Sequence, residues 1–198
     1  MKPVYIIVIG IVLVVGIALS SGFGTYNNLV AADESVTQSW ADVESQYQRR
    51  LDLIPNLVST VQGAASFESE TLQAVVEARA KATSVNVSAG DLGDPDKMAS
   101  FLEAQESLSG ALGRLLMVTE NYPDLRATES FRDLSAQLEG TENRISTARR
   151  DYNATIADYN LSVRKFPASI VAGFTGFERK VPFEAQPGAE KAPNVSFE

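Results

Sequence analysis

Apolar residues follow two different patterns along this chain, a continuous run at the amino end and a helical spacing further on. Between residues 3 and 32 no residue is charged and most are apolar. A helix over residues 3–23 would rise about 32 Å, close to the thickness of about 30 Å of a bilayer's hydrocarbon core. The run therefore predicts a membrane anchor over residues 1–24. The anchor residues of this prediction are Val4, Ile11 and Leu19.

A cleaved signal peptide is the main competing interpretation of this segment, and a buried core helix is a lesser one. Lys2 would supply the short basic region, and Ala18-Leu19-Ser20 resembles a cleavage site with small residues. The apolar run exceeds the about 7–15 residues that are usual for a signal peptide. We therefore expect a retained anchor, with a secreted soluble bundle as the alternative.

Helical spacing begins after this run. Between residues 26 and 85, apolar residues recur at steps of three and four, which is typical of amphipathic helices. Pro55 interrupts the stripe, but the phase continues beyond it, so we expect a kink or a one-turn break rather than a long loop. The stripe consists of Val36, Trp40, Val43, Tyr47, Leu51, Ile54, Val58, Val61, Ala65, Leu72 and Val75.

A second helical region follows a loop over residues 86–95. Asp94 and Pro95 have the sequence of a helix N-cap followed by proline at the first helical position. The spacing predicts a helix from there to about residue 120, and a turn over residues 121–124. Its stripe includes a polar residue, Gln105, among apolar ones.

The last predicted helix, residues 127–165, carries a heptad-like seam of small and aromatic residues. A lone helix would expose this seam, and short connections favour antiparallel neighbours. The predicted fold class is all-α. An N-terminal transmembrane helix is followed by a long antiparallel (up-and-down) helical bundle of three to four helices over residues 25–165.

The tail, residues 166–198, combines prolines and glycines with aromatic residues. Prolines argue against a long helix, and aromatic residues argue against simple disorder. We expect an extended tail whose phenylalanines dock on the bundle, with a partner or membrane-surface role as the alternative. These residues are Phe166, Phe174, Phe177, Phe183 and Phe197.

Composition removes several classes of chemistry. The chain has no cysteine and no histidine, which excludes disulfides, thiolate metal sites, iron–sulfur clusters and the Ser–His–Asp triad. With 17 Lys and Arg against 25 Asp and Glu, the formal charge is −8, which disfavours nucleic-acid binding. Without Lys2 the remaining 16 basic and 25 acidic residues give −9, so the body should stand off anionic lipid. Lys2 on the amino side favours an extracytoplasmic position for the large domain.

The densest polar constellation lies on the last predicted helix, and the first long helix offers residues that would be its natural partners. One interpretation is an interhelical polar network that fixes the register of the bundle. The other is a ligand or partner site. No catalytic, cofactor or metal site is predicted, because Glu139 with Glu142, and Asp91 with Asp94 and Asp96, lack the expected setting or spacing. The candidate residues are Arg49, Arg50, Asp52, Asn56, Glu139, Glu142, Asn143, Arg149, Arg150 and Asn153.

Several motifs resemble the LemA family of bacterial membrane proteins, and the resemblance covers nearly the whole chain. It implies a single amino-terminal transmembrane helix and a long α-helical bundle. Relatives in that family are linked with magnetosome membranes, which implies scaffolding rather than a defined activity. The motifs are Arg49-Arg50-Leu51-Asp52-Leu53-Ile54-Pro55-Asn56-Leu57-Val58, Glu120-Asn121-Tyr122-Pro123-Asp124-Leu125, Leu138-Glu139-Gly140-Thr141-Glu142-Asn143-Arg144-Ile145, Ala148-Arg149-Arg150-Asp151-Tyr152-Asn153, Phe166-Pro167 and Gly176-Phe177.

These observations predict a single-pass protein of the cell membrane that acts as a scaffold or interaction protein. Its expected partners are membrane lipid, through the N-terminal helix, and a protein partner or a second copy of itself. Nucleic acid, a small-molecule substrate and cofactors are not expected. The alternative from another class is an enzyme, or an enzyme accessory, that uses the Glu/Arg/Asn cluster as its ligand site.

Overall fold

The structure is a computed structural model that describes residues 3–63 and 69–184, apart from the side chains of residues 3–7, 18 and 19. Within these residues every regular element is a helix, so the predicted all-α fold class is confirmed. The α-helices are α1 (Pro3–Gln62), α2 (Ser69–Ser84), α3 (Pro95–Val118), α4 (Pro123–Ala127), α5 (Glu129–Arg164) and α6 (Ala168–Thr175). Two 3₁₀ turns are η1 (Ala89–Asp91) and η2 (Thr119–Asn121).

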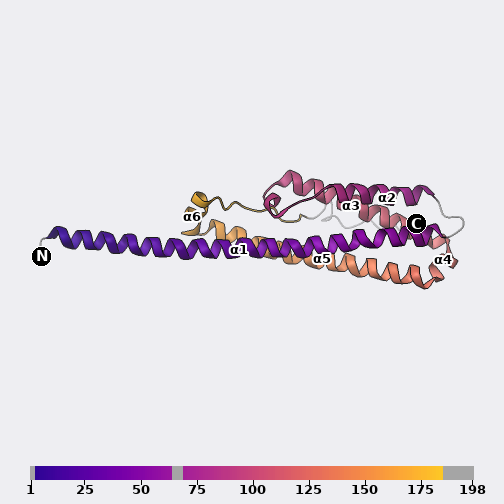
Figure 1. The fold of residues 1–198 in the computed structure, drawn as a ribbon, viewed down its shortest axis with the longest axis horizontal. Helices are drawn as coiled ribbons and strands as arrows, with labels where there is room; N and C mark the ends of the chain where they lie inside the picture. Colours follow the sequence, from indigo (N-terminus) through magenta and orange to yellow (C-terminus); the bar gives the residue numbers. More distant parts are fainter. Residues whose placement is uncertain (1–2, 64–68, 185–198) are drawn as a thin grey trace, which may run out of the picture.

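Four helices form an up-and-down bundle in two antiparallel pairs, α1 with α5 and α2 with α3 (Figure 1). At about 1.5 Å per residue, the 60 residues of α1 measure about 90 Å and the 36 residues of α5 about 54 Å. The amino-terminal part of α1 therefore projects beyond the bundle, as Figure 1 shows.

The projecting part of α1 is apolar and exposed. Its most apolar 18-residue stretch has a mean hydropathy of 2.1, and no part of that stretch is buried. Ile11 is exposed, and Val4 and Leu19 belong to α1, although their side chains are among those outside the described residues. Leu29 is the first buried residue along the described part of α1. One continuous helix thus joins a candidate membrane span to the bundle.

Pro55 lies inside α1 without a one-turn break, which was one of the two predicted outcomes, and the helix continues to Gln62. Proline has no N–H, so the carbonyl of Leu51 lacks its usual helical donor. The Nε of Arg79 on α2 donates to that carbonyl at 3.1 Å. A side chain from the neighbouring helix therefore replaces the hydrogen bond that the proline removes.

The apolar stripe predicted from residue 26 to 85 belongs to two helices, α1 and α2, apart from Ala65, which lies outside the described residues. The predicted N-cap of α3 and the predicted bounds of α5 are close to the structure. Asp94 caps α3 by accepting from the N–H groups of Asp96 and Lys97, at 3.0 and 3.2 Å, and α5 begins and ends within two residues of the predicted bounds.

Two other segments differ from the prediction. The turn expected over residues 121–124 continues into α4, because proline at its first position is preorganised for a helix. The tail, expected to be extended, begins with α6 and becomes extended only after Gly176. Gly176 ends α6 at φ +80°, a conformation that glycine adopts without strain.

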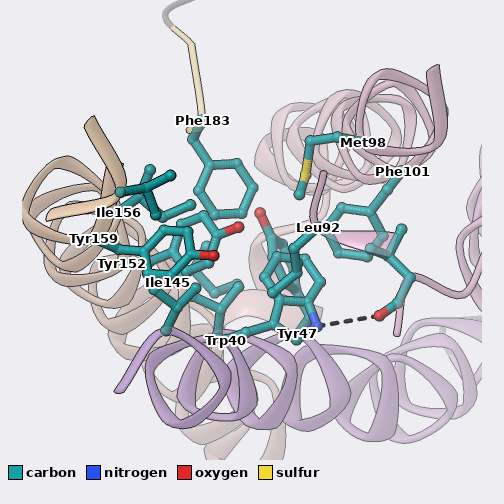
Figure 2. Packing of buried hydrophobic residues seen from close by; sticks show 14 of the residues in the cluster. Trp40, Tyr47, Leu92, Met98, Phe101, Ile145, Tyr152, Ile156, Tyr159 and Phe183 are labelled. Carbon is teal, nitrogen blue, oxygen red and sulfur yellow. Dashed lines mark hydrogen bonds between the residues drawn. The ribbon is translucent and has the colours of Figure 1, made fainter. Parts of the chain in front are cut away.

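The core divides into two clusters along the bundle. The cluster nearer the projecting end is aromatic. The ring of Trp40 lies 5.5 Å from Phe101, 5.4 Å from Tyr152 and 5.9 Å from Phe183, and its Nε1 donates to the carbonyl of Val87 at 3.1 Å (Figure 2). The second cluster is mostly aliphatic and reaches the far end. Phe183 is buried and Phe177 is partly buried against the aromatic cluster, whereas Phe166 and Phe174 are exposed and Phe197 lies outside the described residues.

The Arg79 bond predicts a coupling between α1 and α2 that depends on the proline. Arg79→Met should lower the free energy of unfolding by about 1–2 kcal/mol, because the Leu51 carbonyl loses its donor. In a Pro55→Ala background the new N–H at position 55 replaces that donor, and the loss should shrink. A double-mutant cycle by urea unfolding in detergent measures this coupling. An equal loss in both backgrounds would contradict the explanation.

Candidate functional site

Arg50 is the most deeply buried charged residue among those described, with 1% of its surface exposed. Its Nη1 donates to Ser109 Oγ at 2.7 Å and to Glu142 Oε1 at 2.8 Å. Its Nη2 donates to the Gln105 side chain at 2.5 Å and to the Gln105 carbonyl at 3.3 Å. The guanidinium also lies over the Tyr47 ring, 5.1 Å from the ring centroid. Arg50 on α1 thereby connects α3 and α5.

These residues form a polar layer between the two core clusters. On α1 the layer follows Tyr47 of the aromatic cluster and precedes Leu51 of the other. On α3 and α5 it lies in the same place, since Phe101 and Ile145 belong to the aromatic cluster. A shift of one helix along another would leave the buried cation without its partners, and an unpaired buried charge is strongly destabilising. The polar layer consists of Arg50, Gln105, Ser109, Thr141 and Glu142.

Two hollows meet at this layer. One, of about 280 Å³, is lined by Arg50, Glu142 and Arg149 together with residues of α3. The other, of about 480 Å³, lies between α5 and the tail and is lined by Glu142, Arg149, Arg150, Asn153 and Phe183, with Ile145, Ser146 and Glu184. The Arg149 guanidinium lies 4.7 Å from the centroid of the Phe183 ring. Together the hollows form an open groove that offers guanidinium, carboxylate and carboxamide groups.

The structure brings together half of the predicted site residues. Arg50, Glu142, Arg149, Arg150 and Asn153 line the groove. The exposed residues that line neither hollow are Arg49, Asp52, Asn56, Glu139 and Asn143.

Two of the predicted site residues, Asp52 and Arg150, make side-chain hydrogen bonds within their own helices. Asp52 accepts from Gln48 Nε2 at 2.7 Å on α1, and Arg150 donates to Thr147 Oγ1 at 3.1 Å on α5. Among the residues of the first helix that were predicted to pair with the last helix, Arg50 is therefore the one that bonds to α5, through Glu142.

A repeated Tyr-Asn pair on α5 holds the extended part of the tail. Asn153 donates to the carbonyl of Phe183 and accepts from its N–H, both at 2.8 Å. Asn160 does the same with Lys180, both at 2.9 Å. Each carboxamide thus replaces a peptide group of a neighbouring strand. We call Tyr152, Asn153, Tyr159 and Asn160 the tail clamp.

The spacing of the clamp explains its fit. The two pairs lie seven residues apart on α5, which is about 10.5 Å along a helix. Their partners, Phe183 and Lys180, lie three residues apart in the extended tail, which is about 10 Å. The two tyrosines repeat this spacing. The Tyr152 hydroxyl donates to the carbonyl of Val181 at 3.3 Å, and the Tyr159 hydroxyl donates to that of Glu178, three residues earlier, at 2.9 Å. The tail therefore runs antiparallel to α5 in a matched register.

Loop contacts complete the seat of the tail. The N–H of Val181 donates to the carbonyl of Leu92 at 2.8 Å, and the Lys180 ammonium lies 2.7 Å from Asp33 Oδ1 on α1. Burial raises the pKa of Tyr152, and burial together with the nearby Asp33 carboxylate raises the pKa of Tyr159 to about 12. Both hydroxyls stay protonated donors across the physiological range.

Sequence reasoning missed Gln105 and Ser109 of the polar layer. Gln105 did carry a signal, because it is a polar residue in the apolar stripe of α3. Ser109 carries none, because it is exposed and adjacent to that stripe.

The polar layer predicts unequal effects of two neighbouring arginines on α1. Arg50→Met should lower the free energy of unfolding by about 3 kcal/mol, because the buried Gln105 side chain loses its donor and α1 loses its polar bridge to α3 and α5. Arg49→Met is the matched control, since Arg49 is exposed, and should change stability by less than about 0.5 kcal/mol. Chemical unfolding followed by circular dichroism measures both. Equal losses would show that the layer does not stabilise the bundle.

The tail clamp predicts that two asparagines control the mobility of the tail. Asn153→Ala and Asn160→Ala should each weaken tail docking by about 1–3 kcal/mol, because each leaves an N–H and a carbonyl without partners. Hydrogen exchange of residues 178–184 should therefore accelerate while exchange in α5 stays slow. Asn143→Ala, at an exposed position of the same helix, serves as the control. Unchanged exchange in both clamp variants would refute the clamp.

Comparison with known proteins relates this architecture to a family. The LemA family profile matches residues 39–197. The chain is 28% identical to Magnetosome protein MamQ 2 of Paramagnetospirillum magneticum over 208 residues, covering 95% of this chain and 75% of that protein. It is 24% identical to Protein LemA of Metamycoplasma hominis over 161 residues, covering 81% of this chain and 69% of that protein. Because the match spans most of the chain, including the polar layer and the tail clamp, the chain belongs to the LemA family.

Proposed function

We propose that the chain is a membrane-anchored scaffold whose rigid bundle holds a protein-binding groove at a set height above the bilayer. The observation that carries the proposal is the continuity of α1. A single helix includes both the apolar exposed window and the buried core residues from Leu29 onward. In this proposal residues 1–24 are the anchor, residues 25–165 the bundle and residues 166–198 a tail packed on it.

The continuity of α1 fixes the position and orientation of the bundle relative to the membrane span. A flexible linker would let the bundle rotate freely, whereas a continuous helix bends only gently unless a proline or bulge kinks it. The one proline inside α1 is compensated by Arg79. The helix that crosses the membrane would therefore also orient the groove.

The groove is the candidate contact for a protein partner. Arg149 and Arg150 offer planar guanidinium groups, which pair with carboxylates in a bidentate manner. Glu142 and Glu184 on the same rim offer complementary acceptors. A mixed rim of this kind fits an acidic and polar protein segment better than nucleic acid, which selects for clustered basic residues. The relatives named as magnetosome proteins are consistent with a role in organising a membrane assembly.

Membrane topology follows from the charge near the anchor. Lys2 lies on the amino side of the apolar run, and acidic residues precede the first arginines on the other side. The positive-inside rule then assigns the bundle to the extracytoplasmic side. The strong negative charge of the bundle would keep its flanks away from anionic lipid.

Photo-crosslinking in native membranes tests the proposal. A photoreactive residue at Arg150, on the rim of the groove, should give a discrete protein adduct in the membrane fraction of the full-length chain. The matched control is Arg144, an exposed arginine of the same helix that lies outside the groove. It should give no such adduct, because a partner bound in the groove does not reach it.

Other outcomes would favour the alternatives. A soluble protein with the mass of a cleaved chain would favour the secreted bundle. Adducts from neither position would contradict a protein-binding groove. Loss of phenotype with retained stability in Glu142→Gln or Arg149→Gln, and no protein adduct, would favour the ligand site of an enzyme or enzyme accessory.

A further inference from the structure

The short helix α6 and the chain just before it leave three large apolar side chains exposed. Ile170 and Phe174 lie four residues apart on α6 and are 52% and 88% exposed, and Phe166, which precedes the helix, is 81% exposed. The inward face consists of Ala168, Val171 and Ala172, which are partly or fully buried against the aromatic cluster. An ordinary surface helix turns its largest apolar residues toward the core, whereas α6 also exposes Ile170 and Phe174. A contiguous exposed apolar stripe of this kind marks an interaction surface.

The stripe lies where the projecting part of α1 enters the bundle. α6 packs beside α1 at that end, as Figure 1 shows. Just after α6, the ring of Phe177 contacts the ring of Tyr26 at 5.9 Å. On α1 itself, Phe23 is 70% exposed. The apolar surface of α6 is therefore adjacent to the apolar surface of the anchor.

The level of α6 matches the interfacial layer of a bilayer. If the hydrocarbon core ends near Phe23, Tyr26 lies about 4.5 Å beyond it along the helix axis. The headgroup layer of one leaflet is about 5–8 Å thick. The contact between Tyr26 and Phe177 thus places the segment around α6 within that layer. Aromatic residues are enriched at this depth in membrane proteins.

The charge around α6 also suits contact with the headgroup layer of a bilayer. Residues 164–180 contain four basic residues and one acidic residue, a formal charge of +3 in a chain of −8. Lys180 is paired with Asp33, but Arg164, Lys165 and Arg179 are exposed on either side of α6. Basic residues next to an apolar helix attract anionic headgroups. The α6 segment is therefore basic, next to the acidic Asp33 and Glu34 of α1.

We infer that α6 is an interfacial helix that inserts Phe166, Ile170 and Phe174 into the headgroup layer beside the anchor. The bundle then has two membrane contacts, the span of α1 and the side of α6. A second contact fixes the rotation of the bundle about α1, so that the groove faces a constant direction. This inference rests on the proposed membrane span of α1.

Depth-dependent quenching in vesicles tests the inference. Because the chain has no native cysteine, a single environment-sensitive fluorophore can be attached at one introduced cysteine. Suitable positions are glycines where an added Cβ meets no atom within 4 Å, namely Gly16 in the anchor, Gly173 in α6 and Gly113 on α3. The full-length protein is reconstituted in phosphatidylcholine vesicles with a minority of phosphatidylglycerol and lipids that carry a spin label.

Quenching at Gly173→Cys should lie between the strong quenching at Gly16→Cys and the absence of quenching at Gly113→Cys. Adding Phe166→Ser and Phe174→Ser should abolish quenching at position 173 while leaving the melting temperature unchanged, because both side chains are exposed. Quenching at 173 no greater than at 113, with 16 still quenched, would overturn the inference and leave the anchor intact. A fluorophore shielded from water at 173 but unquenched by lipid would assign the stripe to a second copy. Loss of quenching at 16 would overturn the anchor itself.

Discussion

Burial of a single guanidinium in the middle of the bundle constrains how its helices fit together. Arg50 finds partners on α3 and α5 at one height only, between an aromatic and an aliphatic part of the core. Apolar packing tolerates small slips, because one leucine replaces another at modest cost, whereas a buried charge without its partners is strongly destabilising. We therefore propose that the polar layer sets the register on which the surrounding contacts depend.

The register of α5 in turn places the tail. With α5 held by Glu142, the Tyr-Asn pairs lie beside the aromatic cluster, and the tail runs between α5 and the loop that ends at Leu92. Phe183 then completes the packing around Trp40 (Figure 2). The groove lies where the polar layer meets this docked tail, so the same contacts that stabilise the bundle also build its candidate binding surface.

Sequence reasoning predicted the parts of this structure that are local. Periodicity and capping residues locate α3 and α5, and the uncharged run locates the projecting part of α1. What could not be predicted depends on distant partners. Pro55 does not break α1 because Arg79 of another helix supplies the lost bond. The heptad repeat of Asn153 and Asn160 was visible, but its partners are backbone groups, which carry no sequence signature. Phe166 and Phe174 were expected to dock and are exposed, since composition does not distinguish inward from outward aromatic residues.

The central claim is that α1 is one unbroken rod from the membrane span to the polar layer and beyond. A distance measurement between spin labels at Ser20→Cys and Asp52→Cys, both exposed positions, tests it in the full-length protein reconstituted in lipid. A continuous helix predicts a narrow distribution near about 48 Å, from a rise of about 1.5 Å per residue. A clearly shorter or broad distribution would contradict the account, because α1 would then be bent or flexible between the membrane span and the bundle.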